Sequence, residues 1–116
     1  MENLRFKFRV WDSSANAYVP RSQFILLSDG TLIQEIGGEE VIWESTEPES
    51  CTGLRDKNGK LIYEGDIVTD GTDIFEVIWD YNAWCIQTNK FQHFLTEGFE
   101  ILGNIHENAD LLENEE

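Results

Sequence analysis

Short runs of β-forming residues alternate with turn-forming residues along this chain, and no run has the length and periodicity of a sizeable helix. Asp29-Gly30, for example, separates the apolar runs 24–27 and 31–36. Asp-Gly and Asn-Gly pairs favour hairpins because glycine adopts positive φ without strain. The spacing therefore predicts a mainly β fold, a small antiparallel barrel or meander.

Residues 4–10 alternate apolar and basic side chains without a break and predict the first strand. Successive side chains of a strand point to opposite faces, so one set is expected in a core and the other in water. The expected core set is Leu4, Phe6, Phe8 and Val10, and the expected solvent set is Arg5, Lys7 and Arg9.

The most linker-like stretch is residues 44–50, which carries three acids, one proline and no large apolar side chain. We therefore expect two parts, an N-terminal β lobe over residues 1–46 and a C-terminal barrel lobe over residues 47–116. One turn of helix is expected at 108–112, before a short acidic tail.

The charge of the chain is strongly unbalanced. Its 116 residues include 8 Lys and Arg against 23 Asp and Glu, a formal net charge of −15. Within residues 61–116, Lys90 is the single basic residue. Affinity for nucleic acids depends mainly on neutralising phosphates with basic side chains. We therefore expect no direct binding of DNA or RNA.

The sequence gives no sign of export or membrane insertion. No apolar run approaches the roughly 20 residues that a membrane span needs, and residues 1–11 have no signal-peptide core. Cys51 and Cys85 form no CxxC motif, and small exported domains usually carry more cysteines. We expect a cytoplasmic protein without membrane contact, in which both thiols are reduced and half-buried.

Motifs for catalysis or metal binding are missing from the sequence. It contains no Walker A, GxSxG or HExxH pattern. His93 and His106 are the two histidines, and neither has partners at zinc-ligand spacing. Residues 70–73 lack the length and the final glutamate of a calcium loop, so they are interpreted as a hairpin turn. We expect no enzyme activity, no cofactor and no metal.

Four tryptophans and three tyrosines are many for a chain of 116 residues, and most are expected in the core. Trp11 differs, because the alternation places it on the basic face of the first strand. Tyr81 and Trp84 flank the tip of a hairpin expected over residues 74–88. Exposed aromatic side chains are enriched at protein interfaces. Trp11, Tyr81 and Trp84 are therefore the candidate interaction surface. We expect a homo-oligomer with a subunit contact through Trp11 or the Tyr81–Trp84 tip, and binding to a host protein as a further possibility.

Three segments are distinctive when taken together: residues 5–12 (RFKFRVWD), 52–68 (TGLRDKNGKLIYEGDIV) and 101–108 (ILGNIHEN). In this order and at these separations they closely resemble the YopX family of phage and prophage proteins, over nearly the whole chain. The resemblance implies a small, phage-encoded, predominantly β protein in the bacterial cytoplasm, in which an oligomeric assembly would be unsurprising. It supplies no catalytic residue.

The central segment, residues 52–68, is interpreted as a structural motif that specifies turns and the start of a strand. Asp56, Asn58 and Gly59 predict a tight turn, while Gly65 would allow positive φ and Asp66 would accept hydrogen bonds from nearby amides. A Gly-Asp pair that leads into a first strand, paired antiparallel with the next, looks similar to the opening of SH3-like barrels. We therefore expect an SH3-like barrel in the C-terminal lobe, with inward side chains from Ile67, Phe75, Val77 and Trp79.

Two functions stay open. The first is a non-enzymatic accessory protein that self-associates or binds a host protein. The alternative is an acidic nucleic-acid mimic that blocks a host DNA-binding enzyme, since fifteen net charges match about 25 Å of duplex. Mimicry would require most carboxylates to share one surface, and an even scatter of acids would exclude it.

Overall fold

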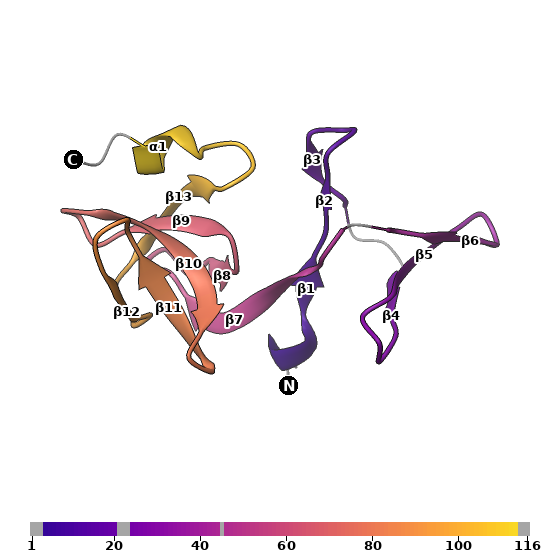
Figure 1. The fold of residues 1–116 in the computed structure, drawn as a ribbon, viewed down its shortest axis with the longest axis horizontal. Coiled ribbons are helices and arrows are strands. Elements are labelled where there is room, and N and C mark those ends of the chain that lie inside the picture. Colours follow the sequence, from indigo (N-terminus) through magenta and orange to yellow (C-terminus); the bar gives the residue numbers. More distant parts are fainter. Residues whose placement is uncertain (1–3, 21–23, 45, 114–116) are drawn as a thin grey trace. The chain divides into compact units, whose positions relative to one another are not determined.

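The computed structural model describes residues 4–20, 24–44 and 46–113, and short β-strands dominate it (Figure 1). The prediction of a mainly β fold is confirmed. The chain divides into two compact units. Unit 1 comprises Met1–Lys7 with Ser50–Glu116, and unit 2 comprises Phe8–Glu49.

These limits differ from the lobes expected at residues 1–46 and 47–116. The first seven residues belong to unit 1, where the amide of Cys51 donates to the carbonyl of Lys7 at 2.9 Å. The boundary between Glu49 and Ser50 falls at the end of the linker-like stretch, within strand β7 (Glu49–Arg55).

The strand predicted over residues 4–10 is wrong in its first half. Leu4–Phe6 form a 3₁₀ turn (η1), in which the amide of Lys7 donates to the carbonyl of Leu4 at 3.2 Å. Phe6 is 69% exposed instead of lying in a core. Strand β1 covers only Phe8–Arg9. Alternation assigns side chains to faces, but a strand also needs a neighbour that satisfies its backbone, and Lys7 and Leu4 bond locally instead.

Unit 2 contains two small antiparallel sheets. Strand β2 (Trp11–Asp12) pairs with β3 (Ala17–Tyr18). The other sheet has the order β4-β5-β6, with strands Phe24–Leu26, Leu32–Ile36 and Glu39–Ile42. The hairpin predicted around Asp29-Gly30 is confirmed by the pairing of β4 with β5.

A polar cluster of unit 2 corrects the prediction that Arg9 faces water. The Glu49 carboxylate is buried, and its Oε1 accepts hydrogen bonds from Arg9 Nε and from the Tyr18 hydroxyl, each at 2.8 Å. The Arg9 guanidinium also lies 4.2 Å from the centre of the Tyr18 ring. A buried carboxylate needs such partners, because a charge without them is costly to remove from water.

Unit 1 is built on a five-stranded sheet with the order β12-β11-β10-β9-β13. These strands are Gln92–Phe94, Ala83–Gln87, Ile74–Asp80, Asp66–Thr69 and Glu100–Asn104, respectively. Strand β7 forms a hairpin with β8 (Leu61–Tyr63), and the predicted helical turn is present as α1 (Asp110–Glu113).

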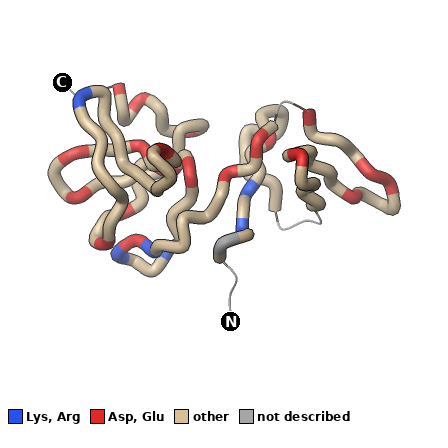
Figure 2. Tube along the Cα trace, turned by 60° about the horizontal axis from the view of Figure 1, so that its bottom comes forward, with Lys and Arg blue, Asp and Glu red and all other residues tan. Residues whose placement is uncertain are grey.

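Acidic residues of unit 1 occur on many separate segments of the chain (Figure 2). Asp70 is exposed in the turn before β10, and Asp80 is exposed at the end of the same strand. Since the 7 residues of β10 span about 23 Å, these two carboxylates lie at opposite ends of the sheet.

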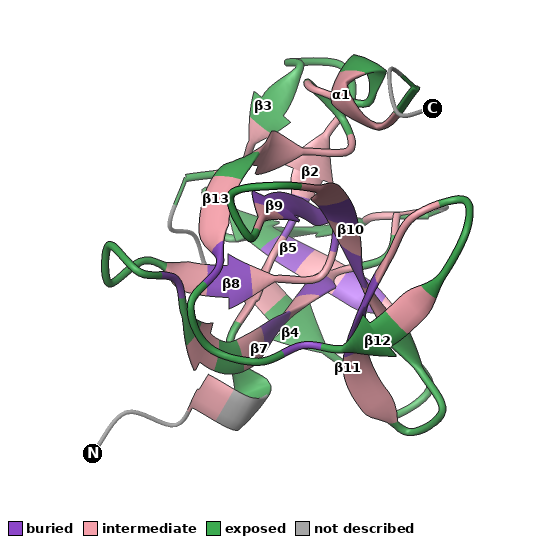
Figure 3. Ribbon diagram, turned by 90° about the vertical axis from the view of Figure 1, so that its left-hand side faces the viewer, coloured by how far each residue is buried: buried purple, intermediate pink, exposed green. Residues whose placement is uncertain are grey.

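The core of unit 1 lies against one face of the five-stranded sheet. Val77 of β10 is directly opposite Ile86 of β11, so both side chains point to this face. Buried segments are visible in β8, β9 and β10 (Figure 3). The core cluster comprises Ile62, Val68, Phe75, Val77, Ile86, Leu95 and Phe99. Ile67 is also buried, but its register opposite Glu76 places it on the other face.

Asp56 holds the turn between β7 and β8 in place. Its Oδ1 accepts from the amides of Asn58 and Lys60, each at 2.9 Å, and its Oδ2 accepts from the amide of Ile101 in β13 at 3.1 Å. Burial alone would raise the pKa of this carboxyl, but the three amides and the charge of Lys60 together lower it from 3.8. The Asp56 charge therefore connects two segments that are 45 positions apart.

A second tight turn connects β8 to β9. Gly65 has a φ of +87°, which only glycine adopts without strain, and its amide donates to the Val77 carbonyl at 2.9 Å. Buried Asp66 accepts from the amide of Tyr63 at 2.8 Å and begins β9. Strand β9 pairs antiparallel with β10, as expected. That the sheet closes as an SH3-like barrel stays a prediction.

Gly103 gives the chain room to turn after β13. The side chain of Asn108 occupies the position that a Cβ on Gly103 would need. Asn108 Oδ1 accepts from the Asn104 amide at 3.1 Å, and the Asn108 amide donates to the Asn104 carbonyl at 2.8 Å. The segment 101–108 is therefore a closing turn in which the glycine and the second asparagine fit together.

Replacing Asp56 by Asn should destabilise the protein by about 1–3 kcal/mol at pH 7, because an amide nitrogen then faces a backbone amide donor. The folded pKa of Asp56 is lowered, so its contribution is complete above the unfolded pKa and is lost as the pH falls through the folded pKa. In urea unfolding, the difference between wild type and Asp56→Asn should shrink below pH 4. An equal difference at pH 7 and pH 3 would contradict this account, and Glu97→Gln is the control.

Replacing Gly103 by Ala should lower the free energy of unfolding by about 1–3 kcal/mol, because the new methyl group displaces the Asn108 side chain. The double variant Gly103→Ala with Asn108→Ala should recover part of this loss. Thermal unfolding of the two single variants and the double variant measures the coupling. Strictly additive effects would show that the two side chains do not compete for this space.

Candidate binding site

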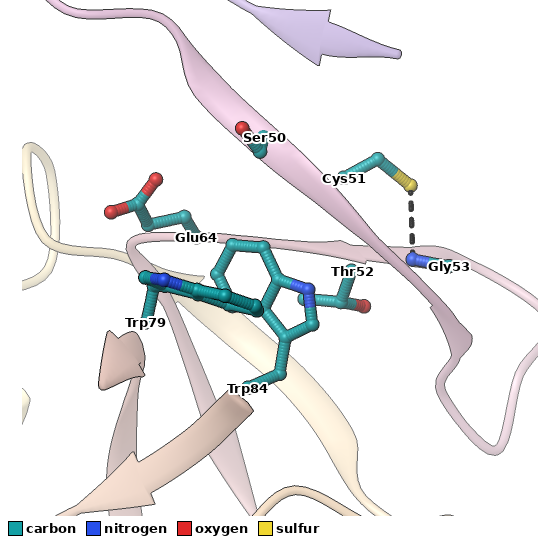
Figure 4. Close-up of a pocket in the computed structure, with 7 residues that line it drawn as sticks. All are labelled: Ser50, Cys51, Thr52, Gly53, Glu64, Trp79 and Trp84. Carbon is teal, nitrogen blue, oxygen red and sulfur yellow. Dashed lines mark hydrogen bonds between the residues drawn. The ribbon is translucent and has the colours of Figure 1, made fainter. Parts of the chain in front are cut away.

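A pocket of about 420 Å³ opens within unit 1, where the β10–β11 hairpin faces strand β7 (Figure 4). Its residues come from three separate segments. Four are consecutive in β7, one lies in the β8–β9 turn, and two are at the hairpin end of β10 and β11. They are Ser50, Cys51, Thr52, Gly53, Glu64, Trp79 and Trp84.

Two indole rings form one wall of the pocket. Trp79 and Trp84 are directly opposite each other in the register of β10 and β11, and their ring centres are 5.0 Å apart at an interplanar angle of 68°. Trp84 is half-buried and packs against the core cluster, whereas Trp79 is 52% exposed. The pair is therefore anchored at one ring and open to a ligand at the other.

The opposite wall is formed where β7 departs from regular pairing. The register of β7 and β8 shifts between Cys51 and Arg55, which marks a bulge or irregularity. Gly53 lies within this shift with a φ of +83°, and nothing lies within 4 Å of the position of its missing Cβ. The irregularity and the absent side chain leave open space across from the indoles.

Hydrogen bonds fix the polar groups of this wall. The Thr52 hydroxyl donates to the Ile62 carbonyl at 2.8 Å and accepts from the Leu54 amide at 3.1 Å. The Cys51 sulfur accepts from the Gly53 amide at 3.4 Å and points away from the indoles (Figure 4). These hydrogen bonds hold the polar groups of the wall in place without a ligand.

Glu64 brings a carboxylate to the pocket. Its amide donates to the Ser50 carbonyl at 3.0 Å, which holds the β8–β9 turn against β7. Figure 4 shows its carboxylate on the Trp79 side of the pocket. The described lining residues combine this carboxylate with a large aromatic surface.

The three candidate interaction residues occupy different places. Trp84 lines the pocket. Tyr81 does not line it; it is 78% exposed at the hairpin tip, where it and Asn82 have φ values of 51° and 57°. Trp11 belongs to unit 2 and is half-buried, with its ring centre 4.9 Å from that of Tyr18.

Most residues of the pocket were not predicted from the sequence. Trp79 was expected among the inward side chains and is instead largely exposed. Its position opposite Trp84 across a four-residue turn was a usable signal, since strands joined by such a turn place these two side chains on one face. Ser50–Gly53 and Glu64 carried no comparable signal.

The described residues show a binding geometry and no metal centre. Nowhere in residues 4–20, 24–44 and 46–113 do three or more His, Cys, Asp or Glu side chains gather closely enough to hold a metal ion. Cys51 and Cys85 are free thiols and are buried, more deeply than the half-burial expected. The helices in this part of the chain are too short to cross a membrane.

The two pocket tryptophans should differ in their contribution to stability. Trp84→Ala removes a ring that packs against the core and should cost about 2–4 kcal/mol. Trp79→Ala removes a mostly exposed ring and one ring contact, at a cost of about 1 kcal/mol. Urea unfolding monitored by circular dichroism compares them, and equal losses would contradict the assignment of Trp84 as the anchor.

Comparison with solved structures supports the fold. The crystal structure of protein yopX from Bacillus subtilis matches with a TM-score of 0.64 at 21% sequence identity, over 93% of this chain and 98% of that chain. The crystal structure of protein EF1440 from Enterococcus faecalis matches with a TM-score of 0.61 at 23% identity, over 91% of this chain and 96% of that one. No curated protein matches the sequence.

The sequence itself matches the family model described as YopX protein over residues 7–113. This range includes the distinctive central and closing segments, and residues 7–12 of the opening one. The match confirms the resemblance that those segments indicated. The chain belongs to the YopX family.

Proposed function

We propose that this chain is a non-enzymatic accessory protein of a phage or prophage, which binds a partner protein through the Trp79–Trp84 pocket. The observation that carries the proposal is the 52% exposure of Trp79 beside an anchored second indole over a cavity of about 420 Å³. Tryptophan is enriched among the residues that dominate binding energy at protein interfaces. A bacterial cytoplasmic setting is part of the proposal and follows from the YopX resemblance.

Charge favours a different protein over a second copy as the partner. Each copy carries a net charge of −15, and the net charges of two copies repel each other when the copies approach within the screening length. A host protein with a basic surface is attracted instead, which raises its association rate. Self-association is therefore the second outcome that the experiment below separates.

Nucleic-acid mimicry receives less support from the distribution of acids. Exposed Asp70 and Asp80 lie at opposite ends of β10. The other acidic residues of unit 1 are distributed over separate segments of the chain (Figure 2). A mimic of duplex DNA needs its charges aligned on one surface, at one charge per roughly 1.7 Å. We therefore place partner binding first.

Capture from a bacterial host lysate tests the proposal with matched baits. Wild type should retain a specific protein that Trp79→Ala loses, whereas Phe94→Ala, which removes another exposed aromatic ring outside the pocket, should retain it. Loss of one aromatic side chain that dominates binding typically weakens the affinity by about 2 kcal/mol or more, roughly thirtyfold.

Sedimentation velocity on the same three proteins identifies the partner class. A wild-type dimer that disappears in Trp79→Ala would assign the pocket to self-association. If all three baits retain the same proteins and sediment identically, binding through this pocket is refuted.

A further inference from the structure

We propose that the outer edge of strand β12 receives an extended segment of a partner protein, which becomes a sixth strand of the unit 1 sheet. Strand β12 stands at the end of the order β12-β11-β10-β9-β13, and among the described residues it pairs with β11 alone. The residues described as lining the Trp79–Trp84 pocket lie on other segments. The inference therefore concerns a second site and goes beyond the function proposed above.

The register of β12 shows which of its backbone groups face outward. Just after this strand, the Leu95 amide donates to the Trp84 carbonyl of β11 at 2.9 Å. In an antiparallel pair only every second residue bonds to a given neighbour, so His93 also faces β11. The N–H and C=O groups of Gln92 and Phe94 therefore point away from β11. An antiparallel segment laid along this side can form four main-chain hydrogen bonds with them.

The other edge of the same sheet is closed within the chain. In β13 the Ile101 amide donates to Asp56 Oδ2 and the Asn104 amide donates to Asn108 Oδ1, each at 3.1 Å. Along β12, no group of the described residues bonds to the outward backbone of Gln92 or Phe94. A strand edge with open donors and acceptors is a template for pairing with another extended chain. The difference between the two edges therefore points to β12 as the one that takes a partner.

The side chains along β12 favour an apolar residue in the added segment. Most of this strand is exposed (Figure 3), and Phe94 is 66% exposed. On the opposite face of the sheet, Phe91 is 41% exposed, and its ring centre lies 5.0 Å from that of His93. Residues directly opposite in neighbouring strands pack side by side, and aromatic rings pair well with β-branched side chains. A valine or isoleucine opposite Phe94 would cover the exposed ring.

Charge does not select a basic segment at this edge. The chain has 23 Asp and Glu, but residues 81–96 include none of them. The Asp80 carboxylate does reach β12, where its Oδ2 accepts from Gln92 Nε2 at 3.2 Å. In strand addition the main-chain bonds supply affinity and alternate side chains supply specificity. We therefore assign the edge to an uncharged extended segment with β-branched residues at alternate positions.

Hydrogen exchange of the β12 amides, followed in ¹H–¹⁵N spectra, tests this assignment. The probe is a blocked Ser-Val-Thr-Val-Ser peptide. When its valines lie beside Phe94, their own N–H groups face β12. In the free protein the Gln92 and Phe94 amides should exchange fast and the His93 amide slowly. We expect a Kd of about 1 mM, and at about ten times this concentration the exchange of Gln92 and Phe94 should slow roughly tenfold. The indole N–H signal of Trp79 should not move.

Matched peptides and variants separate backbone pairing from other contacts. The same peptide N-methylated on both valines keeps the side chains but loses the donors that face β12, so it should not bind at about 10 mM. Gln92→Pro removes an outward N–H, which an edge strand can lack without losing its ladder. It should bind the peptide about fivefold more weakly than Gln92→Ala, which keeps this donor.

Two further variants test the side-chain contact. Phe94→Ala should weaken the peptide about threefold. Leu102→Ala, which removes an exposed apolar side chain of β13 at the other edge of the sheet, should bind like wild type. If Gln92→Pro does not fold, the comparison of the plain and the N-methylated peptide on wild type decides the matter.

Several results would overturn the inference. These are equal affinity for the two peptides, no protection of Gln92 and Phe94 at about 20 mM peptide, or a shift of the Trp79 indole in place of that protection. Protection that grows with protein concentration in the absence of peptide would assign the edge to a second copy, and the assignment to a partner's segment would fall. The capture experiment with Trp79→Ala tests the pocket separately, so either site can fail while the other stands.

Discussion

The three amide hydrogen bonds to the Asp56 carboxylate connect two segments of unit 1 that lie 45 positions apart in sequence. Two of the amides belong to the turn after β7 and the third belongs to β13, so one charge fixes both segments. The Lys57 amide adds a bond to the Phe99 carbonyl at 2.8 Å beside it. With the turn held in this way, β7 and β8 close over the core cluster, and the lining of the pocket is placed as a result.

The pocket illustrates how rigid elements and one local irregularity together create open space. The two-residue tip at Tyr81 and Asn82 keeps Trp79 and Trp84 in register, and Trp84 is fixed by the core. On the other side, the irregularity in β7 around Gly53 prevents the strand from filling the gap. A site on such a scaffold loses little entropy when a ligand binds, because its backbone is already ordered.

Much of the fold could be predicted from local sequence, because hairpin turns and alternating side chains are local properties. The β4–β5 and β10–β11 hairpins and the final helical turn are examples. Leu4–Phe6 could not be predicted, since the alternation there is strand-like and the backbone bonds locally instead. Only part of the pocket could be predicted from the sequence. Trp84 was identified, but Glu64 and Thr52 come close to it only through the tertiary fold.

The short connection between β10 and β11 also limits how this hairpin could change in length. Side chains in a strand alternate between faces with a period of two, so a one-residue insertion or deletion that shifts the pairing sends one indole to the reverse side of the sheet. Tyr81 and Asn82 are exposed, but their positive φ angles disfavour β-branched residues and proline at these two positions. Their number is fixed as well, because the meeting of the two indoles depends on it.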